Sequence, residues 1–221
     1  KKPLNASNPY TGLEYSNKYI DEVLNNDNYK DKVNYQFITD DQEICKLASK
    51  HISEGNVIGW FQNKMEFGPR ALGNRSILAD PRNHNMRDII NLKIKRRETF
   101  RPFAPSILEQ FQDSWLETKF NSPYMSTVGT VKEDKINLVP AITHIDKTAR
   151  FQSVNSKNNL KFYNLIHEFY KITNVPIVLN TSFNENEPIV MKPEEAIDCL
   201  IRTNMDAVFI NNFYIKRSMD I

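Results

Sequence analysis

The sequence predicts an α/β protein in which helices flank a mixed β-sheet. Short apolar segments alternate with amphipathic helical segments along the chain, an arrangement typical of this class. The chain has 221 residues, of which 40% are hydrophobic and 25% charged, an ordinary composition for a folded domain. Because no linker is rich enough in Gly, Pro or Ser to divide it, we expect one compact domain over residues 31–221. Residues 1–30 open with turn-forming residues and are interpreted as an arm or linker.

Helices are predicted where apolar residues recur at spacings of three and four. In the clearest case Ile44, Leu47, Ala48 and Ile52 form one stripe, and a glycine follows the helix as its stop signal. The last helix begins with proline and two glutamates, which suit the first turn of a helix. The predicted helices are Ile20–Leu24, Asp41–Ser53, Met86–Ile94, Leu160–Thr173 and Pro193–Thr203.

Strands are predicted where short apolar or alternating runs lie between turn signals. The run VIGWF and the run PIVL are the most apolar of these. Residues 62–75 lie between the first two predicted strands and are interpreted as a loop. The predicted strands are Val57–Phe61, Ser76–Ala79, Ala104–Leu108, Met125–Val131, Pro176–Leu179, Ala207–Ile210 and Phe213–Ile215.

Composition excludes several classes of protein. No apolar run reaches the roughly 18 residues that a transmembrane helix needs, and the first residues lack the apolar centre of a signal peptide. Cys45 and Cys199 lie far apart in helical patterns, so we expect buried thiols in a reducing, cytoplasmic compartment. The chain does not begin with Met, which favours a piece of a longer protein.

Positive charge is concentrated in one segment. Residues 64–101 hold ten Lys or Arg and four acids, although the formal net charge of the whole chain is only +2. Seven of the ten arginines lie there. A solvated helix face usually alternates its charges, whereas a stretch rich in Arg, Gly and Pro favours a surface that meets an anion.

The first candidate site is the loop EFGPRALGNRS at residues 66–76. Its glycines allow backbone N–H groups to approach a ligand closely, and its proline stiffens the turn. Arg70 and Arg75 offer forked donors suited to phosphate oxygens. The loop lacks the Gly-Lys-Ser/Thr of a P-loop, so a structural turn with solvated arginines is the alternative.

The second candidate site is the basic segment KIKRRETFRPFAPS at residues 93–106. Its cations could surround a polyphosphate, or they could cap the end of a helix, where the helix dipole favours positive charge. Phe100 and Phe103 among these cations would also suit nucleic acid, although the apolar residues that follow favour the core for both rings.

The third candidate site is THIDKTARFQ at residues 143–152. If this segment is a strand, His144 and Asp146 point to the same side and could bind a metal or orient a base. A single His-x-Asp pair is a weak signal, and a satisfied buried histidine is the simpler alternative. Arg150 would join the cations that face phosphate.

The fourth candidate site is the end of the apolar run PIVL, which is followed by Asn180-Thr181-Ser182. Ligands of α/β sheets bind at such strand ends. Asn180 and Ser182 could donate to a carbonyl or phosphate oxygen, and an ordinary turn is the alternative. The candidate residues together are poor in acid–base groups and rich in anion-binding groups, which favours phosphoryl or nucleotidyl transfer over hydrolysis.

The four segments together resemble the C-terminal half of the NodU/CmcH O-carbamoyltransferases. The similarity rests on the strings GWFQNKMEFGPRALGNRSILADPR, FRPFAPSIL, THIDKTARFQ and PIVLNTSFNENEPIV, and on the opening NPYTGLEYS. It covers nearly the whole chain and implies a YrdC-like fold, a twisted mixed sheet with flanking helices. It also implies that ATP, with Mg²⁺, and carbamoyl phosphate form carbamoyl-adenylate here.

In the family a separate N-terminal, actin-like domain, which would hold Fe²⁺, moves the carbamoyl group to a hydroxyl of a sugar, nodulation factor or antibiotic-like metabolite. That domain is the expected partner of this chain, and a homodimer is left open. The resemblance assigns no metal ligand to this chain. It implies a catalytic set of Arg70, Arg150, Asn180 and Ser182. Together with the candidate segments, it gives a predicted substrate- and nucleotide-binding set of Arg75, Lys95, Arg96, Arg101, Ser106, His144 and Asp146.

The chain departs from the family pattern at two loops. Lys147 stands where the family usually has Gly, and the family often has Gly near Asn186. Two alternatives share the fold: a threonylcarbamoyl-adenylate synthase and an RNA-binding YrdC-type module. The strings EFGPRALGNRS and HIDKTAR favour the O-carbamoyltransferase branch, and the low total charge counts against RNA.

Overall fold

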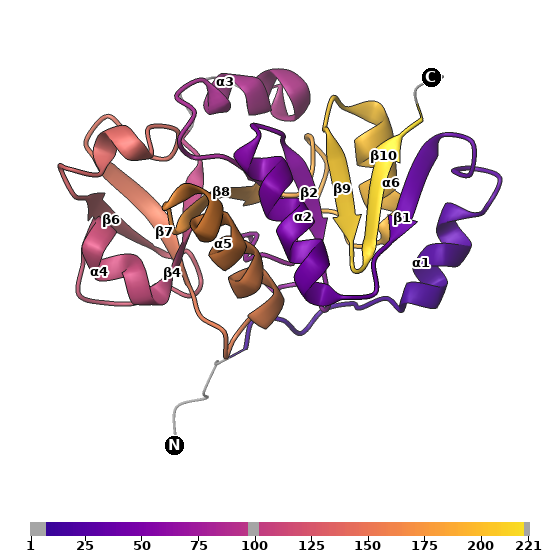
Figure 1. The fold of residues 1–221 in the computed structure, drawn as a ribbon, viewed down its shortest axis with the longest axis horizontal. Helices are drawn as coiled ribbons and strands as arrows, with labels where there is room; N and C mark the ends of the chain where they lie inside the picture. The colour runs from indigo at the N-terminus through magenta and orange to yellow at the C-terminus, as the bar shows by residue number, and fades with distance from the viewer. Residues whose placement is uncertain (1–7, 97–101, 219–221) are drawn as a thin grey trace.

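The computed structural model describes residues 8–96 and 102–218, which form one ten-stranded sheet flanked by helices (Figure 1). Strand β2 pairs with β9 and β4 pairs with β7 in parallel, and the other neighbours are antiparallel. The predicted α/β class with a mixed sheet is therefore confirmed. In spatial order the strands are β1 (Val33–Phe37), β10 (Phe213–Arg217), β9 (Ala207–Ile210), β2 (Ile58–Phe61), β3 (Arg75–Ala79), β8 (Ile177–Ser182), β4 (Ala104–Leu108), β7 (Thr148–Val154), β6 (Thr127–Val131) and β5 (Leu116–Glu117).

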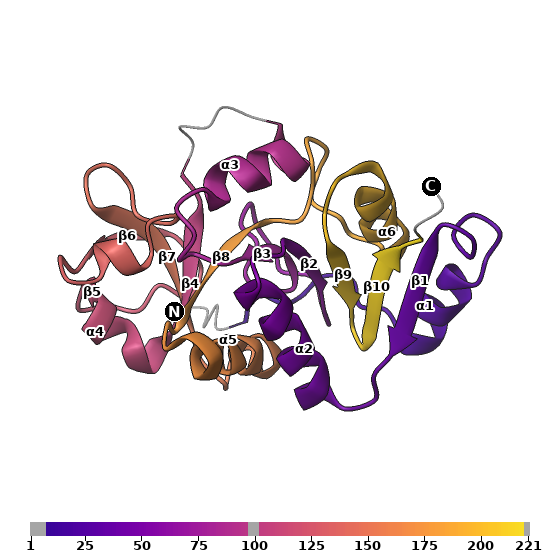
Figure 2. The same ribbon diagram turned by 45° about the horizontal axis from the view of Figure 1, so that its top comes forward.

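Helices cover both faces of the sheet. Helices α2 and α5 pack against each other in front of the sheet in Figure 1, and α6 lies behind β9 and β10. The view in Figure 2 separates the same two layers. The helical segments are α1 (Asn17–Leu24), α2 (Asp41–Ser53), α3 (Met86–Ile90), the π-helix η1 (Asn91–Lys95), the 3₁₀ turn η2 (Glu109–Phe111), α4 (Gln112–Trp115), the 3₁₀ turn η3 (Ile136–Leu138), α5 (Leu160–Thr173) and α6 (Pro193–Arg202).

The two front helices begin at side-chain caps and bury one apolar stripe each. The Asp40 carboxylate accepts from the N–H of Gln42, and the Asn159 amide oxygen accepts from the N–H of Phe162. Each cap satisfies a backbone donor that has no partner within the helix. Helix α5 buries Phe162, Leu165, Ile166 and Phe169 in the core. The predicted bounds of both helices agree with the structure.

The segment predicted as an arm contains an ordered helix. Helix α1 contacts α6, and its residues Ile20 and Leu24 are fully buried. Strand β1, which follows it, was not predicted, although Val33, Tyr35 and Phe37 alternate with polar residues. The signal was weak because β1 is an edge strand on which only Val33 is buried. The division into an arm and a domain at residue 30 stays a prediction.

The helix predicted over residues 86–94 changes character half-way. It is α-helical over Met86–Ile90 and continues as the π-helix Asn91–Lys95, which ends at Arg96 in a left-handed conformation with φ of 44°. The segment therefore rotates its last side chains relative to a regular helix. Cys45 and Cys199 are both buried and unpaired, as predicted. No helix within the described ranges has the length and apolar character to cross a membrane.

Candidate functional site

A small cavity lies where strands β4, β7 and β8 meet the loop between β2 and β3. It encloses about 110 Å³. All four residues predicted as catalytic, Arg70, Arg150, Asn180 and Ser182, line it. Its other described lining residues are Pro69, Ala71, Pro102, Phe103, Ala104, Met125 and Thr181. The structure therefore gathers into one place residues that are up to 112 positions apart in the sequence (from 70 to 182).

Two arginines give the cavity its charge. Arg70 is exposed on the loop. Arg150 is half-buried on β7, and its Nε has no hydrogen-bond partner among the described residues. Burial, together with the like charge of Arg70, lowers the pKa of Arg150. None of the described lining residues is acidic. Two converging cations without a carboxylate favour a bound anion.

A buried carboxylate shapes the loop that carries Arg70. Glu66 Oε1 accepts from the backbone N–H groups of Leu72, Asn74 and Arg75 at 2.5 to 3.2 Å. Gly73 has a φ of +100°, and a Cβ there would lie 2.2 Å from the Phe162 ring. The loop therefore has one well-defined path. Glu66 was not among the predicted site residues, because an acid in a basic loop gave no sign that it would bind the loop's own N–H groups.

A chain of buried side chains underlies the cavity. The Asn180 amide nitrogen lies 2.9 Å from Ser106 Oγ, and Ser106 Oγ lies 2.7 Å from Gln152 Oε1. Gln152 Nε2 donates to the carbonyl of Leu72. Ser106, predicted to bind substrate, is fully buried and does not line the cavity, so it acts by positioning Asn180. No sequence pattern singled out Gln152, which ends a candidate segment.

Lys95 holds the turn after β8. Its Nζ donates to the carbonyls of Ser182 and Asn184, both at 2.7 Å, and to Asn184 Oδ1 at 2.6 Å. The Ser182 hydroxyl donates to the same Asn184 oxygen at 2.8 Å. The Lys95 side chain is only 3% exposed and does not line the cavity, so it fixes the position of Ser182.

Arg75, predicted to contact phosphate, is enclosed within the protein. Its terminal nitrogens donate to the backbone carbonyls of Leu13, Gln62, Asn63 and Asn74 at 2.7 to 3.2 Å. The guanidinium also lies 3.5 Å from the centre of the Phe61 ring. Burial lowers its pKa to about 10, so it stays charged at neutral pH. The structure gives Arg75 a structural role in place of the predicted contact with phosphate.

The other predicted cations are placed differently. Arg96 does not line the cavity, and its Nε lies 3.3 Å from Glu185 Oε1 on the loop after β8. Its side chain is 63% exposed. This pairing removes part of the positive charge that was predicted to face phosphate. Arg101 lies outside the described residues.

His144 and Asp146 lie in the turn before β7, not on a strand. The Thr148 hydroxyl is 2.6 Å from Asp146 Oδ1, which can only accept, and 3.1 Å from His144 Nδ1. Thr148 therefore donates to Asp146 and accepts from Nδ1–H, which leaves His144 Nε2 as an acceptor. Burial, with the charges of Arg150 and Arg87, lowers the pKa of His144 against the opposing effect of Asp146.

A shallow cleft of about 450 Å³ adjoins the cavity. It is lined by Arg87, Pro102, His144, Ile145 and Asp146, and it shares Pro102 with the cavity. The cavity alone is too small for a nucleoside triphosphate, so a nucleotide bound there would extend beyond it. The predicted pair His144 and Asp146 stands beside such a path.

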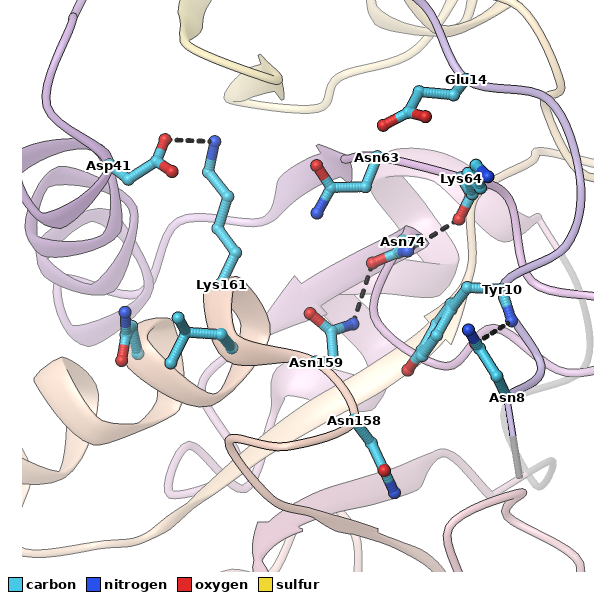
Figure 3. Close-up of a pocket in the computed structure, with 12 residues that line it drawn as sticks. Asn8, Tyr10, Glu14, Asp41, Asn63, Lys64, Asn74, Asn158, Asn159 and Lys161 are labelled. Carbon is cyan, nitrogen blue, oxygen red and sulfur yellow. Dashed lines mark hydrogen bonds and ion pairs between the residues drawn. The ribbon is translucent and has the colours of Figure 1, made fainter.

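A larger pocket of about 420 Å³ lies elsewhere, at the start of α5 (Figure 3). Six asparagines contribute to its wall, and Lys161 pairs with Asp41 at 2.8 Å across one side. Its two lysines, Lys64 and Lys161, are balanced by two acids, Glu14 and Asp41. None of the predicted site residues lines it. The smaller, cationic cavity is therefore the better candidate for an anionic substrate.

Side chains that could ligate a metal are dispersed. Within residues 8–96 and 102–218 no three His, Cys, Asp or Glu side chains come together as a metal site. Phosphate oxygens and water are the usual ligands of Mg²⁺ that accompanies a nucleotide, and few protein carboxylates are needed.

Comparison with known proteins identifies the family. Residues 49–217 match the family model described as "Carbamoyltransferase C-terminus". The chain belongs to this family. The four cavity residues that were predicted as catalytic all fall within the matched region. The resemblance seen in the sequence is therefore confirmed.

Relatives of this carbamoyltransferase domain are longer than the chain. An uncharacterized protein of Methanocaldococcus jannaschii is 43% identical over 96% of the chain and 34% of its own length. The nodulation protein NolNO of Sinorhizobium fredii is 45% identical over 79% of the chain and 26% of its own length. The 3'-hydroxymethylcephem-O-carbamoyltransferase of Streptomyces clavuligerus is 32% identical over 81% of the chain and 32% of its own length. The chain thus spans about a third of the length of the relatives that it matches.

Among solved structures the chain is similar to full-length HypF in its phosphate- and nucleotide-bound form. The TM-score is 0.49 and the identity 17%, over 86% of this chain and 23% of that one.

Proposed function

We propose that this domain activates carbamoyl phosphate with ATP and forms carbamoyl-adenylate. The observation that carries the proposal is the convergence of Arg70 and Arg150 on a cavity with no acid among its described lining residues. Carbamoyl phosphate is a small dianion, and a cavity of about 110 Å³ matches its size. Forked guanidinium donors suit its phosphate and the α-phosphate of ATP. Family membership supports the same class of reaction.

The proposed reaction has two balanced steps. Water cleaves carbamoyl phosphate into carbamate and inorganic phosphate. A carbamate oxygen then bonds to the α-phosphorus of ATP while the bond to pyrophosphate breaks. Arg70 and Arg150 would stabilise the negative charge that gathers on the phosphoryl oxygens, and such charge stabilisation supplies much of the catalysis in phosphoryl transfer. Mg²⁺ would enter on the phosphates of ATP.

Four of the other predicted residues would support the reaction at this site. Ser106 and Lys95 position Asn180 and Ser182 from beneath the cavity. His144 and Asp146 stand beside the adjoining cleft, where the nucleoside would extend. Arg101 stays a predicted phosphate contact outside the described residues.

Transfer to the final acceptor is assigned to the rest of a longer protein. The relatives exceed the chain about threefold in length, and two of them carry names that refer to nodulation and to O-carbamoyl transfer. We therefore assign the hydroxyl acceptor, and the Fe²⁺ expected of an actin-like domain, to residues outside this chain. The isolated chain is expected to carbamoylate no acceptor.

The test is to incubate the chain with labelled ATP and carbamoyl phosphate, with and without Mg²⁺, and to separate the nucleotides. The expected result is Mg²⁺-dependent release of AMP and pyrophosphate that requires carbamoyl phosphate, because the labile adenylate hydrolyses. Arg150→Ala should abolish it, and Arg202→Ala, an exposed arginine paired with Glu187, should not. ATP binding without any AMP would mean that this domain does not catalyse activation by itself.

A further inference from the structure

The amide of Asn180 has only one orientation that the structure permits. Its nitrogen lies 3.2 Å from the carbonyl oxygen of Ala71, an atom that can only accept. The same nitrogen lies 2.9 Å from Ser106 Oγ and 3.3 Å from Gln152 Oε1. If the amide were reversed, its oxygen would face the Ala71 oxygen at the same distance. The nitrogen side of Asn180 is therefore turned toward the protein.

The neighbours of Asn180 reinforce that orientation. Gln152 Nε2 donates to the Leu72 carbonyl at 2.9 Å, which fixes Gln152 Oε1 as an acceptor. Ser106 gives its hydroxyl hydrogen to that oxygen, so Ser106 Oγ can accept from Asn180. Each of these three side chains is at most 2% exposed. A buried network whose members are all directed in this way holds its amide against rotation.

This orientation leaves one polar atom of Asn180 without a partner among the described residues. Asn180 Oδ1 is buried and has no hydrogen-bond partner within residues 8–96 and 102–218. A buried acceptor without a donor is unfavourable, and most such atoms in folded proteins are satisfied by some partner. Asn180 lines the cavity, so a ligand bound there can supply this donor.

Ser182, the second neutral side chain predicted to bind the ligand, also turns its hydrogen-bond donor toward the protein. The Ser182 hydroxyl donates its hydrogen to Asn184 Oδ1 at 2.8 Å. Asn180 and Ser182 were predicted to donate to a carbonyl oxygen, but the hydrogens of both are directed to protein oxygens. Donors to a ligand oxygen are instead the two arginines, and the neutral groups are acceptors.

We infer that Asn180 Oδ1 accepts an N–H of the carbamoyl amino group and so selects carbamoyl phosphate over acyl phosphates that lack this group. The inference rests on the proposed function, since it concerns how the amino end of the same substrate is bound. Acetyl phosphate keeps the carbonyl and the phosphate but has a methyl group in place of the amino group. A site that hydrogen-bonds an N–H rejects an analogue without it, because the acceptor is then left buried and unpaired. Asn180 is thereby a specificity-determining residue.

The test compares the two phosphates by calorimetric titration of the wild-type chain. Carbamoyl phosphate is expected to bind at least about tenfold more tightly than acetyl phosphate. In Asn180→Leu and in Asn180→Ser the ratio should fall to about one, mainly through weaker binding of carbamoyl phosphate. Gln62→Leu is the matched control. Gln62 is also a fully buried amide whose oxygen has no partner in the described part of the chain, but it does not line the cavity. The control should keep the wild-type ratio.

The outcomes separate the two claims. Equal affinity of the wild type for both phosphates overturns the role of Asn180 and leaves carbamoyl-phosphate activation standing. The same inference is overturned if either folded Asn180 variant keeps the wild-type ratio. Binding of neither phosphate overturns the proposed function together with the inference. The wild-type ratio needs no variant, so equal affinities in the wild type would overturn the inference even if both Asn180 variants fail to fold.

Discussion

Arg70 and Arg75 belong to the same eleven-residue segment, residues 66–76, but their side chains lie in opposite environments. Arg70 is exposed at the cavity, where its charge acts on the half-buried Arg150. Arg75 is fully buried, stacked on Phe61, and surrounded by four backbone carbonyls. The difference shows that an arginine beside glycines can bind either a ligand or the carbonyls of its own backbone. Its hydrogen-bond partners in the folded chain distinguish the two roles.

The comparison also explains the shape of the loop. Glu66 satisfies three of the loop's N–H groups, and Arg75 satisfies carbonyls on the segments that flank it. These buried ions of opposite charge order the backbone between them. Arg70 is left on the exposed part of that backbone, where it can meet a ligand without rearrangement of the loop.

The largest expected effect is on stability, from Arg75→Met. The variant leaves four carbonyls without their charged donor, and we expect a loss of about 3 kcal/mol or more in the free energy of unfolding. Urea unfolding followed by the fluorescence of the buried Trp60 and Trp115 measures it. An unfolding free energy equal to that of the wild type would show that Arg75 has no structural role.

The next effect is on affinity, from Arg70→Ala. Loss of one charge-assisted contact should weaken binding of ATP or carbamoyl phosphate by about 10- to 100-fold, since such contacts are worth about 1.5–3 kcal/mol. Calorimetric titration measures the affinity, and urea unfolding of the same variant should match the wild type. Unchanged affinity would show that Arg70 does not bind the ligand, and that it does not differ from Arg75 in this respect.

A smaller effect is expected from Arg96→Ala. The sequence assigned this residue to phosphate, but the structure pairs it with Glu185 at the surface. Because Arg96 does not line the cavity, we expect affinity for ATP within about threefold of the wild type. A loss as large as that of Arg70→Ala would show that Arg96 reaches the ligand after all.

The smallest effect concerns the titration of His144. Its folded pKa lies below the ordinary value of 6.5, so at a pH between the two values the unfolded chain binds more protons. His144 therefore reduces stability progressively as pH falls through 6.5, and not above it. An NMR titration should give a midpoint below 6.5, and Arg150→Ala should move it upward by removing a positive charge. A midpoint that Arg150→Ala leaves unchanged would contradict their proximity.

Much of the fold could be predicted from periodicity. Helices α2 and α5 were predictable because their apolar residues repeat on one face and their ends carry caps or stop signals. Strand β1 was missed because an edge strand buries too little to leave an apolar run. The π-helical turn at Asn91–Lys95 was missed because the apolar spacing of residues 86–94 also fits a regular helix.

The sequence predicted which residues line the cavity better than it predicted how their side chains are arranged. The motifs carrying Arg70, Arg150, Asn180 and Ser182 pointed to the residues that the fold brings together. Burial is a property of the folded chain, so no local pattern could show that Arg75 would be enclosed. The orientation of the Asn180 amide likewise depends on Ser106, on the adjacent strand β4, and on Gln152, on β7 beyond it.

The central claim is that the cavity between Arg70 and Arg150 forms carbamoyl-adenylate. The most direct measurement is exchange of labelled pyrophosphate into ATP, catalysed by the chain with Mg²⁺ and with or without carbamoyl phosphate. We predict exchange that requires carbamoyl phosphate and that Arg150→Ala abolishes while Arg202→Ala retains. Absence of exchange in a wild-type chain that binds both ATP and carbamoyl phosphate, or full exchange in Arg150→Ala, would contradict the claim.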